Sequence, residues 1–358
     1  MTPDRPPLAD LASFDEIIDV RSPAEFAEDH IPGAINCPVL DDEQRIVVGT
    51  LYKQVSPFEA RKIGAALVSE NIARHLREHF LDKAKDWKPL IYCWRGGNRS
   101  GSMTTVFRAI GWKAIQLDGG YKTWRSHVVT QLESLPQAFA FRVVCGATGS
   151  GKTRILQAIA DLGEQVLDLE TLASHKGSVL GVLPGQPQPS QKSFETSLLT
   201  VLAGFDPARP VYVEAESRKI GRLHVPEARI ERIRRGECLH VEATLDARVA
   251  FLLNDYDYFL TMPDFLLQRL DGIKSLHSRE TFARWHELVR SADWPTLVRE
   301  LLEQHYDALY RRSQNQNFTG YRHPEAFSTD DLSTDGIAEL APPLLHSRPA
   351  QNARREAG

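Results

Sequence analysis

The chain has 358 residues, of which 42% are hydrophobic and 25% are charged, and its formal net charge is −4. This is the composition of an ordinary soluble globular protein with room for two domains, and the charge excludes a chain that is basic overall. A nucleic-acid surface would therefore have to be a local patch. Because no apolar run approaches the roughly 20 residues of a membrane span and the N-terminus lacks a signal-peptide pattern, we expect a cytoplasmic protein without membrane contact.

Strand-like apolar runs alternate with helical stretches, which predicts an α/β fold. In the first part the sequence predicts strands over 16–20, 90–92 and 114–117 and helices over 23–29, 58–80, 101–110 and 121–135. Pro136 breaks this pattern, so we place a domain boundary at 135/136. A strand over 138–145 opens the second unit, which we expect over 136–244, followed by a helical part over 245–344. The polar tail, 345–358, is predicted to be disordered.

Four cysteines are spread along the chain without CxxC or zinc spacing, so we expect no disulfide in a cytoplasmic protein. Cys93 differs from the other three, Cys37, Cys145 and Cys238, because it lies in "YCWRGGNRSGSM", directly after a buried strand and before a helix. Helix N–H groups and the nearby Arg95 and Arg99 would favour the thiolate over the free thiol, whose pKa is roughly 8.5. The loop therefore predicts a nucleophilic Cys93, and the alternative is a small buried core cysteine.

Three motifs in order resemble the rhodanese family over roughly residues 10–130. They are "DVRSPAEFAEDHIPGAIN" (19–36), the cysteine loop, and "LDGGYKTW" (117–124). The resemblance implies that Cys93 carries sulfur or selenium, and that Asp19, Arg21 and His30 mainly shape the fold.

The cysteine loop is one residue longer than the usual rhodanese loop, because Arg99 follows Cys93 by six positions instead of five. This spacing is that of CX5R phosphatases, including phosphatases built on the rhodanese fold, so a phosphatase-like module is an alternative for this loop. A longer loop holds a tetrahedral oxyanion. Selenophosphate is also tetrahedral, so the length fits a selenium donor too.

The second unit opens with "FRVVCGATGSGKTRIL", which fits the P-loop pattern after a strand and before a helix. Its diphosphate-binding candidates are Gly146, Gly149, Gly151, Lys152 and Thr153. Backbone amides would hold the phosphates, Lys152 would neutralise their outer oxygens, and the Thr153 hydroxyl could bind Mg²⁺.

Polar residues at other strand ends and loops are further candidates. Acids that could orient a metal or substrate are Asp168, Glu170, Glu214 and Glu216, and each could equally be a solvated acid. His175 and Lys176 form a polar loop that could face the ligand. Arg218, Lys219 and Arg222 lack nearby acids other than Glu216, so we favour a phosphate-contacting loop there. A tRNA backbone could be gripped by Arg269, Lys274, His277 and Arg279, unless this face is merely solvated.

Together with "LASHKGSVLG" (172–181) and "VEAESRKIGRLHVP" (213–226), the two loops make the chain resemble the tRNA 2-selenouridine synthase family over about residues 10–320. The resemblance implies an N-terminal rhodanese-like domain and a P-loop NTPase-like parallel-sheet domain with a helical extension that contacts tRNA. It implies a transferase that geranylates wobble 2-thiouridine in the anticodon loop with geranyl diphosphate. The transferase then replaces S-geranyl by selenium from selenophosphate, with Cys93 as selenium carrier.

The same resemblance implies no permanent cofactor, with Mg²⁺ as an optional ion, tRNA as partner and a selenophosphate supplier as a conceivable second partner. Two alternatives remain open from the residues themselves. One is a sulfurtransferase fused to an ATP-dependent kinase or ATPase. The other is a binding module in which the P-loop regulates a partner.

Overall fold

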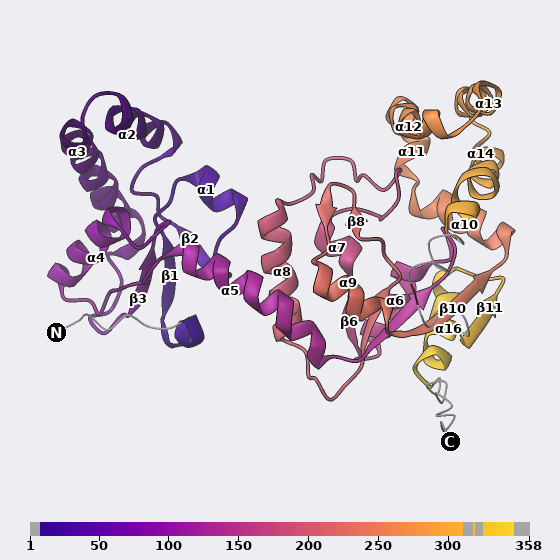
Figure 1. Cartoon of the computed structure of the whole chain (residues 1–358), viewed down its shortest axis with the longest axis horizontal. Coiled ribbons are helices and arrows are strands. Elements are labelled where there is room, and N and C mark those ends of the chain that lie inside the picture. Colours follow the sequence, from indigo (N-terminus) through magenta and orange to yellow (C-terminus); the bar gives the residue numbers. More distant parts are fainter. Residues whose placement is uncertain (1–7, 311–317, 319–324, 347–358) are drawn as a thin grey trace, which may run out of the picture. The chain divides into compact units, whose positions relative to one another are not determined.

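The computed structural model of the chain (Figure 1) describes residues 8–310, 318 and 325–346. The chain divides into two compact units. The first comprises Met1–Gln131 together with Ser190–Thr200, and the second comprises Leu132–Pro189 together with Val201–Gly358. The division falls close to the expected boundary at 135/136, but the return of residues 190–200 to the first unit was not predicted. Among the described helices, none is long and apolar enough to cross a membrane.

The first unit contains a four-stranded parallel sheet in the order β2-β1-β3-β4. Its strands are β1 (Glu16–Asp19), β2 (Ala34–Asn36), β3 (Pro89–Tyr92) and β4 (Ile115–Gln116). All four residues of β3 are buried, as expected for a central parallel strand. The three predicted strands are confirmed, whereas β2 is too short and too mixed in sequence to stand out.

Helices of the first unit are capped where the sequence provides short polar side chains. Asp41 accepts a 2.7 Å hydrogen bond from the amide of Gln44, which starts a helix that the sequence analysis did not predict. The predicted 58–80 helix is confirmed, with a π-helical last turn. The helices are η1 (Leu8–Ser13), α1 (Pro23–Glu28), α2 (Asp42–Gln54), α3 (Pro57–His75), η2 (Leu76–Phe80), α4 (Asn98–Ile110) and α5 (Tyr121–Ser134).

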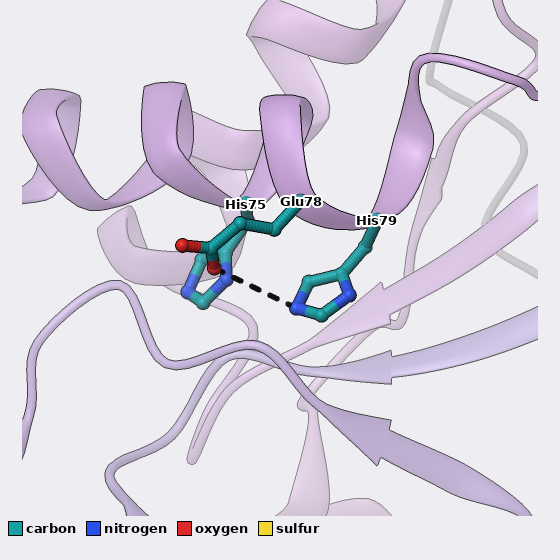
Figure 2. Close-up of side chains that lie close together, drawn as sticks. All are labelled: His75, Glu78 and His79. Carbon is teal, nitrogen blue, oxygen red and sulfur yellow. Dashed lines mark ion pairs between the residues drawn. The ribbon is translucent and has the colours of Figure 1, made fainter.

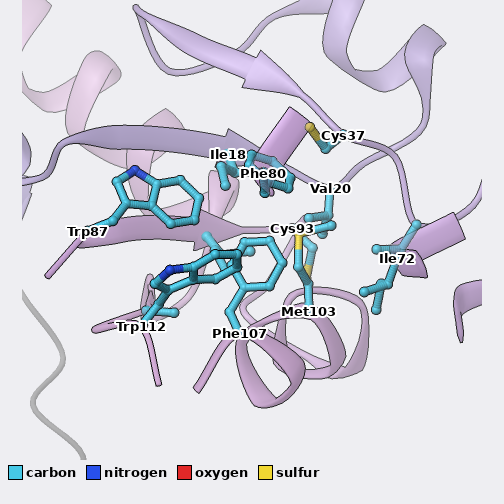
Figure 3. Close-up of a cluster of buried hydrophobic side chains, with 13 residues drawn as sticks. Ile18, Val20, Cys37, Ile72, Phe80, Trp87, Cys93, Met103, Phe107 and Trp112 are labelled. Atoms are coloured by element: carbon cyan, nitrogen blue, oxygen red, sulfur yellow. The ribbon is translucent and has the colours of Figure 1, made fainter. Parts of the chain in front are cut away.

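An aromatic-rich core joins the sheet to α3, η2 and α4 in the first unit (Figure 3). Phe107 and Trp112 meet edge to face with ring centroids 5.1 Å apart, and Phe107 packs in the same way on Phe80 at 5.2 Å. Cys93 and Cys37 both belong to this cluster. Cys93, the predicted nucleophile, is thus held in place by the buried side chains of this core.

The second unit contains a five-stranded parallel sheet in the order β11-β10-β5-β7-β6. The strands are β5 (Phe141–Cys145), β6 (Gln165–Leu167), β7 (Val211–Glu214), β10 (Glu237–Ala243) and β11 (Glu325–Thr329). A separate hairpin joins β8 (Lys219–Ile220) to β9 (Leu223–His224). Because β11 completes the sheet from near the C-terminus, the expectation that 245–344 is purely helical was wrong.

Two groups of helices complete the second unit. Apolar side chains of α6, α10 and α16 pack against β5, β7 and β10. The remaining helices of the region after Thr244 form a lobe with its own core around Trp285. The helices of the second unit are α6 (Lys152–Asp161), α7 (Leu169–Ala173), α9 (Glu227–Arg234), α10 (Leu245–Asp255), α11 (Tyr258–Thr261), α12 (Pro263–Leu270), η4 (Asp271–Leu276), α13 (Arg279–Arg290), α14 (Trp294–Leu301), η5 (Leu302–Tyr306) and α16 (Thr334–His346). Most of α8 (Gln191–Ala203) belongs to the first unit, because that unit includes Ser190–Thr200.

The prediction that 345–358 is disordered is wrong for Leu345 and His346, because both belong to α16. The rest of that prediction, 347–358, lies outside the described residues.

Candidate functional site

Cys93 occupies the bend between β3 and α4, as the sequence predicted. Its thiol sulfur accepts hydrogen bonds from the Gly97 amide at 3.3 Å and from the Ser100 hydroxyl at 3.2 Å. The residue is only 3% exposed. Ser100 was missed by sequence reasoning, although a small hydroxyl in the first turn of the helix after a cysteine could have indicated it. Both donors thus point at the sulfur itself and fix its position in the loop.

The Cys93 loop lies tightly against the turn that follows β4. Gly96 has φ +64°, and a Cβ there would lie 2.7 Å from the Leu117 carbonyl oxygen. An L side chain would therefore clash with backbone that cannot move aside. This close approach explains the glycine in the loop more directly than flexibility does.

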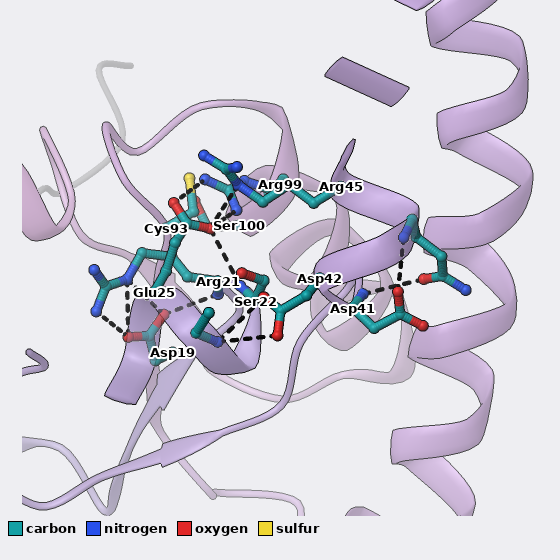
Figure 4. A network of polar contacts seen from close by, with 12 residues as sticks. Asp19, Arg21, Ser22, Glu25, Asp41, Asp42, Arg45, Cys93, Arg99 and Ser100 are labelled. Carbon is teal, nitrogen blue, oxygen red and sulfur yellow. Dashed lines mark hydrogen bonds and ion pairs between the residues drawn. The ribbon is translucent and has the colours of Figure 1, made fainter. Parts of the chain in front are cut away.

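Arg99 and Arg95, both expected beside Cys93, have different surroundings. Arg99 donates hydrogen bonds of 2.6 and 3.3 Å to the two carboxylate oxygens of Glu25, which also pairs with Arg45 at 2.9 Å (Figure 4). Arg95 is exposed. The loop thus carries a positive charge that is held in place by Glu25, a residue that the sequence analysis did not select.

Asp19, Arg21 and His30 make the contacts of structural residues. Arg21 and Asp19 form a fully buried ion pair at 2.6 Å, and Arg21 also donates to the Asp29 carbonyl oxygen at 2.6 Å. Burial alone would lower the pKa of Arg21, but its hydrogen bond to Asp19 and the Asp19 charge outweigh burial and raise it. His30 stacks on Phe26 with ring centroids 3.8 Å apart.

The P-loop joins β5 to α6, which begins at Lys152. Gly149 and Gly151 have φ angles of +81° and +74°, the left-handed conformation that a tight loop requires of glycine. The Lys152 ammonium donates to the Gly146 carbonyl oxygen at 2.9 Å, across the mouth of the loop. The loop thus lies between a strand and a helix as the sequence predicted, and its role in binding a diphosphate stays a prediction.

Three carboxylates and one hydroxyl converge beside the P-loop. Thr153 Oγ1 lies 2.9 Å from Glu170 Oε2 and 3.1 Å from Glu214 Oε2, and the ligand-type oxygens of Glu170, Glu214 and Glu216 lie within 4.8 Å of one another. Burial, with mutual repulsion, raises the pKa of Glu170 to about 8 and that of Glu214 well above its usual range. Burial also raises the pKa of Glu216.

This all-oxygen set fits a hard divalent cation such as Mg²⁺. A bound cation would supply the positive charge that offsets the repulsion among the three carboxylates. The cradle is tight, because a Cβ at Gly177 would lie 2.4 Å from Glu170 Oε1 and 2.6 Å from Glu216 Oε1. Glu170, at the start of α7, joins the two acids of the β7 strand end only because β6 and β7 are neighbours in the sheet.

The other predicted polar residues of this region have clear positions. Asp168 caps α7, since it accepts the Thr171 amide at 2.8 Å and the Thr171 hydroxyl at 2.7 Å. His175 is buried, and burial lowers its pKa. Lys176 pairs with Asp255 at 2.6 Å and lies over the Tyr256 ring at 4.3 Å.

A cavity of about 510 Å³ opens in front of the P-loop. Its lining includes Gly149, Gly151, Lys152, Thr153, Glu170, His175, Lys176, Glu216, Tyr256 and Tyr310. A second, apolar cavity of about 70 Å³ adjoins it and shares Thr148, Ser178, Leu252, Tyr256 and Tyr306 with it. The apolar cavity is otherwise lined by Leu180, Leu253, Phe259, Leu260, Leu266, Trp294, Leu297, Val298, Leu301 and Leu302. Together the two cavities have one polar and one apolar end. The sequence analysis did not locate the apolar end.

The basic residues that follow β7 are placed differently from the expectation. Arg218 pairs with Glu227 at 2.7 Å, so it does have a nearby acid. Arg222 donates to the carbonyl oxygens of Gln188 and Pro189, and Lys219 is exposed on β8. These three are not among the described residues that line the P-loop cavity.

The four tRNA candidates lie at the junction of α12, η4 and α13, as the sequence pattern predicted. Arg269 lies over the Phe265 ring and Lys274 over the Phe282 ring, while Arg279 is exposed. His277 instead turns inward, because its Nε2 lies 3.0 Å from His305 Nδ1 and its ring packs on Trp285.

Comparison with known proteins separates the same two regions. Residues 7–127 match the rhodanese-like domain, and residues 139–272 match the tRNA 2-selenouridine synthase AAA domain. The tRNA 2-selenouridine synthase of Alcanivorax borkumensis is 32% identical over 344 residues, which cover 86% of this chain and 92% of that protein. The chain belongs to the tRNA 2-selenouridine synthase family.

A second tRNA 2-selenouridine synthase supports this assignment. The Nitrosomonas europaea protein is 36% identical over 258 residues, which are 71% of this chain and 66% of that protein. A solved N-terminal domain from a Clostridium difficile 630 protein is 33% identical, with a TM-score of 0.32, and covers 35% of this chain and 99% of that chain. The chain is thus an enzyme of this family, with a rhodanese domain first and a P-loop domain after it.

Proposed function

We propose that the chain converts wobble 2-thiouridine of tRNA into 2-selenouridine in two steps. The thiocarbonyl sulfur first attacks C1 of geranyl diphosphate, so that a C–S bond forms, the C–O bond breaks and diphosphate leaves. The selenium of selenophosphate then attacks C2 of the base, so that a C–Se bond forms, the C–S bond breaks and the geranyl thiol leaves. Water finally cleaves the Se–P bond and releases phosphate. Alkylation serves the second step, because a thiocarbonyl sulfur is a poor leaving group and a thiol is a better one.

The observation that carries the geranyl step is the apolar cavity beside the P-loop. A P-loop alone suits any diphosphate, including that of a nucleotide. A geranyl chain has no polar atoms, and walls such as Leu252, Leu260 and Leu297 offer it no polar partner. The arrangement therefore supports a prenyl diphosphate whose charged head lies at Lys152 and whose chain lies between α10 and α14.

The leaving diphosphate would be held by the chain's own groups. P-loop amides and the Lys152 ammonium lie where its negative charge grows, and such donors contribute most when they are preorganised. Thr153, Glu170, Glu214 and Glu216 would hold Mg²⁺, which supplies further positive charge to the diphosphate. We assign Arg218, Lys219 and Arg222 to tRNA phosphates outside the cavity.

Selenium handling is assigned to Cys93. The Gly97 amide and the Ser100 hydroxyl already point at its sulfur, and Arg99 supplies positive charge from the first turn of α4. A selenophosphate bound beside Cys93 would offer its selenium as the nucleophile. We further propose that the protein works in the cytoplasm, where tRNA is found and where its four free cysteines stay reduced. A selenophosphate-producing enzyme would supply the selenophosphate.

The decisive experiment is mass spectrometry of nucleosides from 2-thiouridine tRNA after incubation with the protein. Geranyl diphosphate alone should yield S-geranyl-2-thiouridine, and selenophosphate should then yield 2-selenouridine. Leu260→Trp, at the edge of the apolar cavity, should raise KM for geranyl diphosphate and leave inhibition by inorganic diphosphate unchanged. Leu162→Trp, exposed on the same unit, is the matched control. ATP hydrolysis without any use of geranyl diphosphate would instead support the fused sulfurtransferase–ATPase.

A further inference from the structure

Two histidines and a glutamate lie together outside both candidate sites, where α3 passes into the π-helical turn η2 (Figure 2). His75, Glu78 and His79 occupy helical positions i, i+3 and i+4, which places their side chains on one side of the helix. One ligand-type atom of each lies within 4.8 Å of the others. Glu78 Oε2 lies 3.8 Å from His79 Nε2, and the two imidazole rings are 5.9 Å apart.

His75 is held in the orientation of a metal ligand. Its Nε2 lies 2.9 Å from the Pro38 carbonyl oxygen, which can only accept, so Nε2 carries the proton and Nδ1 has a free lone pair. That Nδ1 is buried and has no hydrogen-bond partner among the residues that the structure describes, and His75 as a whole is 4% exposed. A histidine whose other nitrogen donates to a backbone carbonyl is the usual arrangement around a bound metal.

The other two side chains are free to close on an ion. Glu78 and His79 have side chains that are 52% and 51% exposed, so rotation costs them little. Arg74 lies 3.9 Å from Glu78 Oε2, a long contact between exposed groups that a divalent ion would outcompete. The helix widens at the turn that carries Glu78 and His79, and such π-turns often mark functional positions.

We propose that His75 Nδ1, Glu78 and His79 bind one divalent transition-metal ion of the zinc class. Two imidazoles and one carboxylate suit Zn²⁺, Co²⁺ or Ni²⁺ and are poor ligands for Mg²⁺. Three protein ligands leave a fourth position for water. Because His75 also contacts Pro38, the ion would fasten the end of α3 to the segment after β2, next to the core that contains Cys93 and Cys37.

The test uses the untagged full chain, stripped with a chelator and kept in millimolar Mg²⁺ so that the all-oxygen cluster does not contribute. Co²⁺ is titrated while the visible absorption is followed, and Zn²⁺ is then added as competitor. Wild type should bind one Co²⁺ per chain with the spectrum of a four-coordinate nitrogen and oxygen site, and Zn²⁺ should displace it and raise Tm.

Variants at the two exposed ligands keep the proposal falsifiable even if His75→Ala fails to fold. His79→Ala and Glu78→Gln should each weaken Co²⁺ binding at least tenfold and remove the Zn²⁺-dependent rise in Tm. His127→Ala and Glu70→Gln, elsewhere on the same unit, should bind as wild type does. The proposal is overturned if wild type binds no Co²⁺ under these conditions, or if His79→Ala and Glu78→Gln bind with unchanged stoichiometry and affinity.

Discussion

Arg99, in the first turn of α4 next to the Cys93 loop, donates a 2.6 Å hydrogen bond to Glu25 of α1. Burial alone would raise the pKa of Glu25, but the hydrogen bond and charge of Arg99, with the charge of Arg45, outweigh burial and lower it. The ionised Arg99–Glu25 pair therefore contributes to the stability of the first unit.

Glu25→Gln should lower the free energy of unfolding of the first unit by about 1–2 kcal/mol at pH 7. A carboxyl whose folded pKa is lowered stabilises the fold above its unfolded pKa of about 4.3, and this stabilisation is lost as pH falls through the folded value. The difference between variant and wild type should therefore shrink below pH 4. Hydrogen exchange of β1 and β3 amides measures it, with exposed Glu43→Gln as control. A difference that is equal at pH 7 and pH 3 would contradict the ion-pair account.

Cys93→Ser should abolish 2-selenouridine formation and leave S-geranylation largely intact. The reason is that the selenium role is assigned to Cys93 and the diphosphate role to the P-loop. Nucleoside mass spectrometry should show S-geranyl-2-thiouridine accumulating in the variant. Cys37→Ala, in the same buried cluster, should cost packing only. Selenouridine formed at the normal rate by Cys93→Ser would remove Cys93 from the mechanism.

Lys152→Ala should slow geranyl transfer by about 10²–10³, because an ammonium that faces a leaving diphosphate acts mainly in the transition state. Supplying tRNA that already carries S-geranyl-2-thiouridine should restore selenium incorporation. Single-turnover rates of the two steps measure this, and exposed Lys53→Ala is the charge-matched control. An unchanged alkylation rate would exclude the P-loop from the first step.

Arg269, Lys274 and Arg279 changed together to Ala should weaken tRNA binding and flatten its salt dependence. Each lost phosphate contact should reduce the slope of log affinity against log salt by roughly 0.7–0.9. Geranyl diphosphate binding should persist, since these residues do not line the described part of its cavity. A salt titration compares this variant with one changed at Lys53, Arg61 and Lys62. Equal slopes in all three proteins would show that tRNA binds elsewhere.

The sequence predicted those parts of the two sites that lie within one short stretch of the chain. The P-loop needs glycines at positive φ between a strand and a helix, and Gly149 and Gly151 meet that need. The Cys93 bend likewise lies within a dozen residues. Helix spacing also placed Arg269, Lys274 and Arg279 at one junction, although it gave no sign that His277 turns toward His305.

Features assembled from distant segments could not be predicted in the same way. Glu170 meets Glu214 only through the order of the strands, and the apolar cavity combines α10, α11 and α14 with residues near 180. β11 was missed because a short edge strand has little apolar pattern and becomes a strand by pairing with β10. Glu25 was overlooked because its partner Arg99 lies 74 positions away.

Residues 190–200 have a consequence for how the chain is made. Within the first unit, Thr196 donates to the buried Asp29 at 3.0 Å, and Lys192 pairs with Glu28 at 2.8 Å. The ribosome must therefore extend the chain about 70 residues beyond Gln131 before these partners exist, a delay on the order of 3–14 s at 5–20 residues per second. During that interval Asp29 has the Tyr121 hydroxyl as a partner but lacks the Thr196 hydroxyl. A fragment that ends at residue 127, where the match to the rhodanese-like domain ends, would lack both of these contacts permanently.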